Sequence, residues 1–157
     1  MPGAGYAPLA ATQLSANSAL DRPKLYLESQ AVIAQQLEKR PEDPTWLQAK
    51  GRAQMLAREY DSAIDTLRRA QDNAAGDSRF AAAVAVDLAT ANFERARALG
   101  RPEGIGEANE LLSKVLSSDP NDAVALFNRA IVRESMSLFE NARKDLERFL
   151  TLEPSGG

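Results

Sequence analysis

The fold of this chain is decided by residues 44–70, which read PTWLQAKGRAQMLAREYDSAIDTLRRA. The same pattern returns in residues 123–149, which read AVALFNRAIVRESMSLFENARKDLERF. Aligning the two copies brings residues of one kind together: Leu47 with Leu126, Gly51 with Ala130, Tyr60 with Phe139, Ala63 with Ala142, and Leu67 with Leu146. An internal repeat of this length predicts paired helices, each of which buries its apolar face against its neighbours.

The small residues explain how the two helices of a copy would meet. Gly51 and Ala63 stand on either side of the turn in the first copy, and Ala130 and Ala142 do so in the last. Antiparallel helices approach most closely where side chains are small, and bulky side chains fill the space beside the crossing. We therefore expect these four residues to be buried where the helices cross.

The order small, aromatic, small, large apolar, followed by a proline, resembles the tetratricopeptide repeat, whose period is about 34 residues. Pro120 and Pro154 match its closing proline. The resemblance implies an all-α fold, an α-solenoid of antiparallel helix pairs with about three repeats and an N-terminal capping helix. Two features depart from the family pattern. Lys50 and Arg129 stand where the family has a large residue, and the first copy lacks the closing proline.

A third, irregular copy lies between the other two. Its second helix reads IGEANELLSKVLSSDP, with Ile105 in the aromatic slot, Ala108 in the small slot and Leu112 in the large apolar slot. The step from Ala63 to Ala108 is longer than the family period, so we expect a longer first helix and an extended turn near residues 99–104. This extension is either a tolerated loop or a surface specific to this protein.

Helical periodicity, together with Pro, Gly and capping residues, sets the expected boundaries. Helices are predicted at residues 24–40, 45–57, 60–73, 77–98, 104–117, 122–135 and 138–151. Residues 1–23 are predicted to be a flexible or extended N-terminal segment, residues 24–153 the repeat domain, and residues 154–157 a tail at a truncation point.

A second resemblance concerns the whole chain. The segments YAPL at 6–9, ALFNRAIVRE at 125–134 and LEPSGG at 152–157, with the irregular middle copy, are similar to tetratricopeptide regions of large bacterial proteins that carry a C-terminal caspase-like (CHAT) peptidase domain. The resemblance implies that this chain is part of a larger protein. Phe149 and Leu150 close the last predicted helix, so we expect an apolar strip there.

Composition excludes several kinds of chemistry. The chain of 157 residues contains no histidine and no cysteine, which removes Ser–His and Cys–His nucleophile pairs and zinc sites built on those ligands. Two acidic pairs lie near the N-termini of predicted helices: Asp61 with Asp65, and Glu107 with Glu110. Acidic side chains are favourable there because they interact with the positive end of the helix dipole, so a structural role explains both pairs. We therefore expect no enzymatic activity, no metal site and no cofactor.

The charge pattern narrows the range of partners. A net charge of −3 with both signs interspersed argues against a nucleic-acid partner, which would need a basic face. No stretch approaches the roughly 18 apolar residues of a membrane span, and the N-terminus does not resemble a signal peptide. We therefore expect no membrane partner and a cytoplasmic location.

The resemblance also implies where a partner would bind. In tetratricopeptide proteins the first helix of each repeat lines a concave groove, and the corresponding residues here are Gln48, Arg52, Met55, Phe93, Phe127, Asn128, Ile131 and Glu134. This groove would be apolar with a few polar anchors, and would bind a protein or peptide segment. The residues that grip a C-terminal carboxylate in some family members are not matched.

Three alternatives to this groove remain. Phe127 and Ile131 can instead belong to the core. The N-terminal segment, through Tyr6 or Leu9, can occupy the groove of its own chain or of a neighbouring copy. Finally, the chain can act as a structural spacer or oligomerisation segment that uses the face of its terminal helix.

Overall fold

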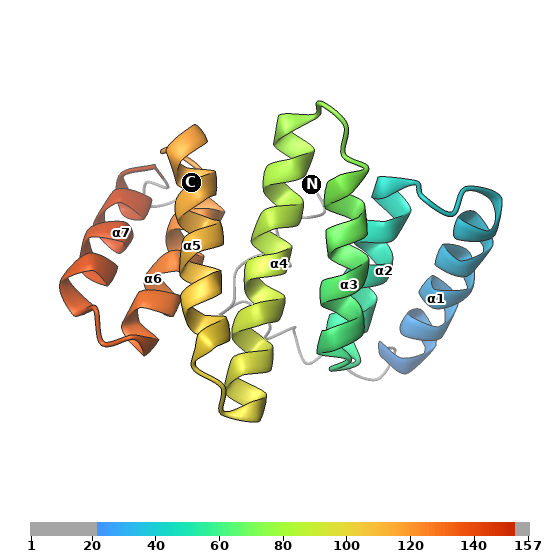
Figure 1. The fold of residues 1–157 in the computed structure, drawn as a ribbon, viewed down its shortest axis with the longest axis horizontal. Helices are drawn as coiled ribbons and strands as arrows, with labels where there is room; N and C mark the ends of the chain where they lie inside the picture. Colours follow the sequence, from blue (N-terminus) through green and yellow to red (C-terminus); the bar gives the residue numbers. More distant parts are fainter. Residues whose placement is uncertain (1–21, 153–157) are drawn as a thin grey trace. The chain divides into compact units, whose positions relative to one another are not determined.

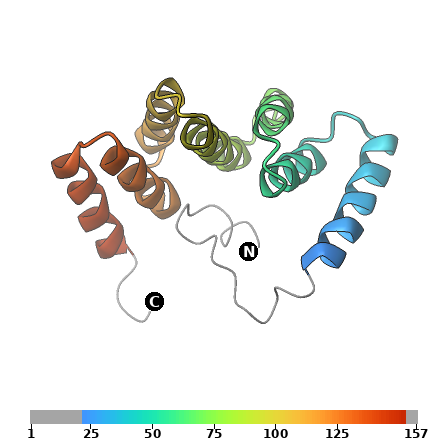
Figure 2. The same cartoon turned by 90° about the horizontal axis from the view of Figure 1, so that it is seen from below.

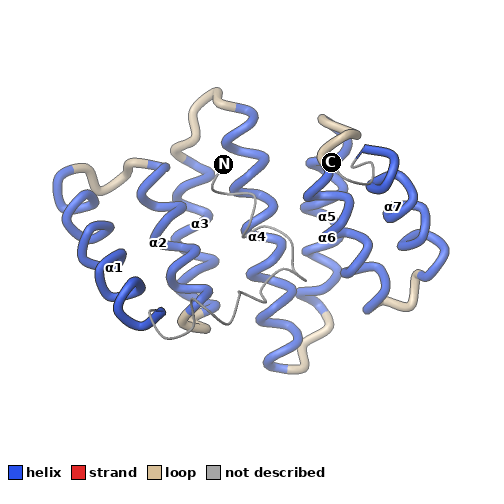
Figure 3. The backbone as a smooth tube through the Cα atoms, turned by 180° about the vertical axis from the view of Figure 1, so that it is seen from behind, coloured by secondary structure: helices blue, strands red, loops and turns tan. Residues whose placement is uncertain are grey.

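A computed structural model describes residues 22–152, and this part of the chain is all α (Figure 3). It contains seven helices: α1 (Arg22–Lys39), α2 (Pro44–Leu56), α3 (Tyr60–Asp72), α4 (Ser78–Leu99), α5 (Glu103–Ser118), α6 (Ala123–Ser135) and α7 (Phe139–Leu152). Every predicted helix is present, and each end lies within two residues of its predicted place. The predictions for the N-terminal segment and the tail fall on residues 1–21 and 153–157, outside the described residues.

Helices that follow one another in the chain pack as adjacent antiparallel pairs, as in a helical-repeat or solenoid-like arrangement (Figure 1). The described residues divide into two compact units, 22–84 and 85–152, so the boundary falls within α4. The first unit contains α1–α3 and the start of α4. The second contains the rest of α4 and α5–α7, and Figure 2 shows α6 and α7 side by side.

Two hairpins, α2 with α3 and α6 with α7, share the same local structure. Asp43 caps α2 by accepting a hydrogen bond from the Thr45 N–H at 3.0 Å, and Asp122 caps α6 by accepting one from the Ala125 N–H at 3.0 Å. Such caps satisfy backbone donors that the first turn of a helix leaves without a partner. The cap of α2 is therefore Asp43, whose side chain also lies within reach of the Trp46 N–H.

The turns of the two hairpins also correspond. Arg58 and Ser137 both adopt positive φ, 63° and 62°. The next residue then donates its N–H back to the preceding helix, from Glu59 to the Gln54 carbonyl and from Leu138 to the Arg133 carbonyl, both at 2.8 Å. A residue in the left-handed region ends each first helix and reverses the chain. The internal repeat is thus a repeat of backbone structure as well as of sequence.

Close helix approach explains two glycines. A Cβ built on Gly51 would lie 2.6 Å from the Cγ and Cδ2 atoms of Leu67, which is buried in the first hairpin. In the second unit, a Cβ on Gly104 would lie 2.8 Å from the Asn92 carbonyl oxygen, so α4 and α5 also approach closely. The glycine side of each crossing leaves room for the neighbouring helix.

The small residues lie where the repeat pattern predicts. Ala63, Ala108, Ala130 and Ala142 are all buried, as is Gly51. Leu112 of the irregular middle copy is also buried, which supports its alignment with Leu67. In α4 the alanine-rich run predicted as a longer helix forms one helix to Leu99, with Ala85, Ala89 and Ala91 in the core.

Candidate functional site

Three of the predicted partner-binding residues lie on α2, in the first unit. Gln48 and Arg52 are half-buried, and Met55 is buried. They stand four and three residues apart, so they share one face of the helix. The structure therefore brings these three together, with Met55 closer to the core than the other two.

Four more of these residues lie on α6, in the second unit. Phe127 and Ile131 are half-buried, Glu134 is exposed and Asn128 is fully buried. The Phe127 ring packs against Phe149 of α7, with ring centroids 5.2 Å apart and planes tilted by 46°. Aromatic pairs with tilted rings at this separation are favourable. Phe127 is therefore held in place by α7 while part of its surface stays accessible.

Phe93 has a different environment from the other predicted residues. It is buried in α4, and the Arg97 guanidinium lies 5.6 Å from its ring centroid, a cation–π contact. Phe93, Met55 and Asn128 thus have buried side chains, whereas Gln48, Arg52, Phe127, Ile131 and Glu134 keep accessible surface. The prediction that all eight line one groove stays a prediction, because they are divided between the two units.

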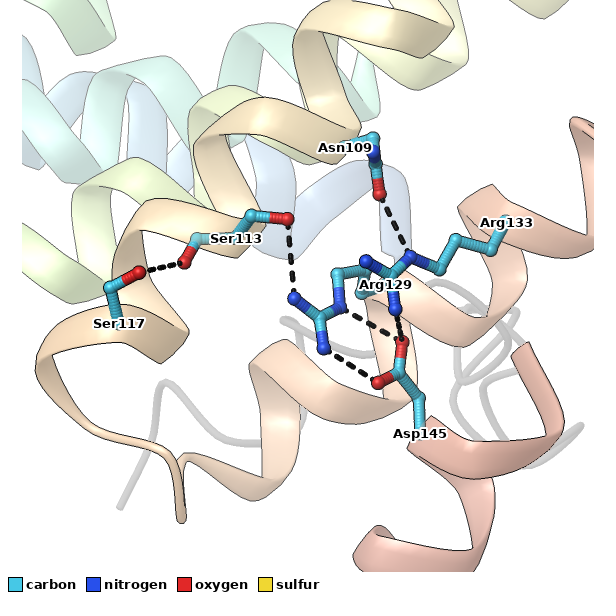
Figure 4. A network of polar contacts seen from close by, with 6 residues as sticks. All are labelled: Asn109, Ser113, Ser117, Arg129, Arg133 and Asp145. Carbon is cyan, nitrogen blue, oxygen red and sulfur yellow. Dashed lines mark hydrogen bonds and ion pairs between the residues drawn. The ribbon is translucent and has the colours of Figure 1, made fainter. Parts of the chain in front are cut away.

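The strongest polar feature of the second unit joins α5, α6 and α7 (Figure 4). The Asp145 carboxylate accepts hydrogen bonds from Arg129 Nη2 at 2.7 Å, Arg129 Nε at 2.9 Å and Arg133 Nη1 at 3.1 Å. Arg129 also donates to Ser113 Oγ, and Arg133 to Asn109 Oδ1, each at 3.2 Å. We call these five residues the polar centre.

Burial sets the energetic importance of the polar centre. The Asp145 side chain is 4% exposed, and those of Arg129 and Arg133 are 16% and 17% exposed. Burial lowers the pKa of Arg133, which the negative charge of Asp145 partly counteracts. If Asp145 is removed, the two partly buried guanidinium groups lose their negative partner, and leaving buried charges uncompensated is strongly destabilising.

Sequence reasoning missed this centre. It treated Arg129 only as a departure from the family pattern at a position that the first copy fills with Lys50. A signal was available, because the last copy is also charged at Arg133 and Asp145, where the first copy has Gln54 and Thr66. These coordinated differences point to one interaction that the first hairpin lacks.

The last helix exposes apolar side chains, as the sequence predicted. Leu150 is exposed and Phe149 is half-buried against Phe127. The strip also includes Phe139 and Leu146, which the prediction did not name. Whether it meets another molecule stays a prediction.

No family model and no curated protein matches this chain. Across the helices of residues 22–152, none is both long and apolar enough to cross a lipid bilayer. The same range places no three carboxylates where they would hold a metal ion.

Proposed function

We propose that the chain is a tetratricopeptide-like module that binds a peptide or partner segment of another protein. The proposal is supported by the repeated hairpins, with their shared caps, turns and small-residue crossings. Helical repeats of this kind present side chains from successive first helices as a continuous binding surface. In the last hairpin of this chain the first helix is α6.

One observation carries the proposal, namely the partly accessible apolar face of α6. Val124, Phe127 and Ile131 are all half-buried and recur at helical spacing. Phe127 packs against Phe149, a contact that favours one orientation of its ring. A rigid aromatic side chain with accessible surface is a common anchor in protein interfaces, because little conformational entropy is lost on binding.

The partner's chemistry follows from these side chains. Phe127 and Ile131 favour a segment with one or two apolar side chains. The N-terminal segment of the chain, through Tyr6 or Leu9, is one candidate occupant and lies outside the described residues. A protein partner is the other.

A peptide-array or pull-down screen tests the proposal, followed by affinity measurements on variants. Ile131→Glu should weaken binding at least about tenfold, because a carboxylate then replaces an apolar side chain of the α6 surface. Phe127→Ala should weaken it similarly, although it also removes the contact with Phe149. Leu99→Glu, an equally polar change at an exposed leucine of α4, serves as the control. A partner whose affinity is unchanged by both Ile131→Glu and Phe127→Ala would contradict the proposed surface.

The alternative role, assembly through the terminal helix face, has an observation of its own. Phe139, Leu146 and Leu150 form an exposed apolar stripe on α7. This role does not compete with peptide binding, because the stripe and the α6 face involve different residues.

A further inference from the structure

The exposed stripe on α7 differs sharply from its counterpart in the first hairpin. Phe139 and Leu150 are each 63% exposed, and Leu146 is 39% exposed. On α3 the corresponding core residue Leu67 is 0% exposed, and Ile64, at the position of Arg143, is 2% exposed. The repeat therefore uses this face for packing in one copy and leaves it open in the other. We call Phe139, Arg143, Leu146 and Leu150 the C-terminal stripe.

The first helix exposes a second apolar stripe. Leu25 is 55% exposed and Val32 is 46% exposed. They stand two helical turns apart, about 10.5 Å along the axis, and so do Phe139 and Leu146. Glu28 lies between Leu25 and Val32 on the same side of α1, and it is exposed, as is the neighbouring Lys24. We call Lys24, Leu25, Glu28 and Val32 the N-terminal stripe.

The two stripes are complementary in one antiparallel register. Placing Leu25 against Leu146 brings Val32 opposite Phe139, because both pairs have the same spacing. The same register sets Glu28 opposite Arg143. It also sets Lys24 opposite Glu147, which already accepts a hydrogen bond from Arg143 at 2.6 Å. Apolar residues thus meet apolar residues, and each charge meets one of opposite sign.

Pairing of the C-terminal stripe with itself lacks this complementarity. In an antiparallel pair of α7 helices, setting Phe139 against Leu150 of the other copy places Arg143 against Leu146. Arg143 would then face the apolar Leu146 of the other copy. It would gain no acidic partner beyond Glu140 and Glu147, with which it already forms ion pairs. Charge complementarity therefore selects α1 as the helix that covers α7.

We propose that the C-terminal stripe of one copy binds the N-terminal stripe of a second copy, so that chains associate head to tail. Such a contact is heterologous: each copy keeps one open stripe of each kind and can add a further copy. A single helix pair buries less than the roughly 1,200 Å² of a stable complex, so association is weak and depends on concentration. The proposal is independent of the α6 surface and of what binds there.

Sedimentation velocity over a concentration series up to about 1 mM tests this contact. The parent chain should show growing average mass, with species larger than a dimer at the top of the series. Arg143→Glu and Glu28→Lys should each weaken association about five- to tenfold, because like charges then face each other. The chain that carries both changes should recover association. Lys144→Glu, the same charge reversal on the exposed surface of α7 outside the stripe, should leave it unchanged.

A mixing experiment separates the head-to-tail contact from self-pairing of α7. Leu146→Glu and Val32→Glu each disable one stripe, so each variant alone should remain a monomer, while their mixture should form dimers and nothing larger. Circular dichroism verifies that both exposed-site variants stay helical. The proposal is overturned if the parent is a monomer throughout, if Val32→Glu alone associates as the parent does, or if the double charge reversal fails to restore association.

Discussion

The hairpins α2–α3 and α6–α7 have the same backbone and different interiors. Both begin at an aspartate cap, turn at a residue with positive φ and cross at small residues. The first is held by apolar packing of Leu67 against Gly51. The last is held by the polar centre, in which Asp145 replaces the buried Thr66 of the first. Local capping and turn chemistry thus specify the hairpin, whereas its interior can be stabilised by either apolar or ionic contacts.

The same comparison explains the position of Leu146. Gly51 leaves a space that Leu67 fills, whereas Ala130 carries a Cβ at the corresponding place. Leu146 is partly exposed while Leu67 is fully buried. A single methyl group at the crossing therefore accompanies a different packing of the large residue opposite, as expected for close-packed interiors.

The largest effect should come from the polar centre. Asp145→Ala removes the only carboxylate between Arg129 and Arg133 in that centre, and should lower the free energy of unfolding by about 3–5 kcal/mol. Thr66→Ala, at the corresponding position of the first hairpin, should cost about 1 kcal/mol or less.

Urea unfolding can assign the loss to a region. The one tryptophan, Trp46, lies in α2 and reports on the first hairpin, while circular dichroism reports on all helices. Asp145→Ala should shift the circular dichroism transition more than the Trp46 fluorescence transition. Equal stability of Asp145→Ala and the parent would show that the polar centre contributes nothing to folding.

Substitutions at the helix crossings should cause the second largest loss of stability. Gly51→Ala should destabilise the chain by about 1–3 kcal/mol, because the new Cβ overlaps Leu67 in the first hairpin. This loss would appear although alanine favours a helix by about 1 kcal/mol over glycine. Combining Gly51→Ala with Leu67→Val should cost less than the sum of the two single changes, as measured in a double-mutant cycle. Strict additivity would indicate that the two side chains do not compete for one space.

Glycine substitutions in the two turns should raise the free energy of unfolding rather than lower it. Arg58→Gly and Ser137→Gly should each raise the free energy of unfolding by about 0.5–1 kcal/mol, because glycine adopts positive φ without the steric cost of a side chain. Ala57→Gly, one position earlier at negative φ, should lower it instead. Similar gains at Arg58 and Ser137 in thermal unfolding would confirm that the two turns are equivalent, and a loss at either would separate them.

Surface charge should have the smallest effect. In the last hairpin a hydrogen bond from Arg143 lowers the pKa of Glu140, and in the first unit one from Arg69 lowers the pKa of Glu42. A carboxyl group with a lowered pKa in the folded state adds stability above its ordinary pKa of about 4.3, and loses it as the pH falls through the lower folded value.

NMR titration of the glutamate side chains would measure this effect. Arg143→Ala should return the pKa of Glu140 toward its ordinary value and leave that of Glu42 unchanged, while Arg69→Ala should do the reverse. Both pairs are exposed, so Arg143→Ala should leave the unfolding midpoint at neutral pH nearly unchanged. A large loss of stability would show that Arg143 acts beyond its surface pairs.

Much of the fold was predictable because its signals are local. Aspartate caps, the run without Gly or Pro in α4, and the recurrence of small residues all act within a few residues of the chain. The alignment of the irregular middle copy was also predictable, and burial of Ala108 and Leu112 agrees with it. The predicted binding residues were harder to judge, because their periodicity shows which helix face they share without showing how deeply that face is buried.

The sequence by itself determined the helices, their order and the residues at which they cross, since these depend on periodicity and turn chemistry. Only the tertiary structure decided which side chains meet across helices. It joins Arg129 to Asp145, sixteen positions apart, and rests Phe127 on Phe149. It also buries Asn128 while leaving Leu146 partly open. These outcomes depend on what packs from distant parts of the chain, and no local pattern carries that information.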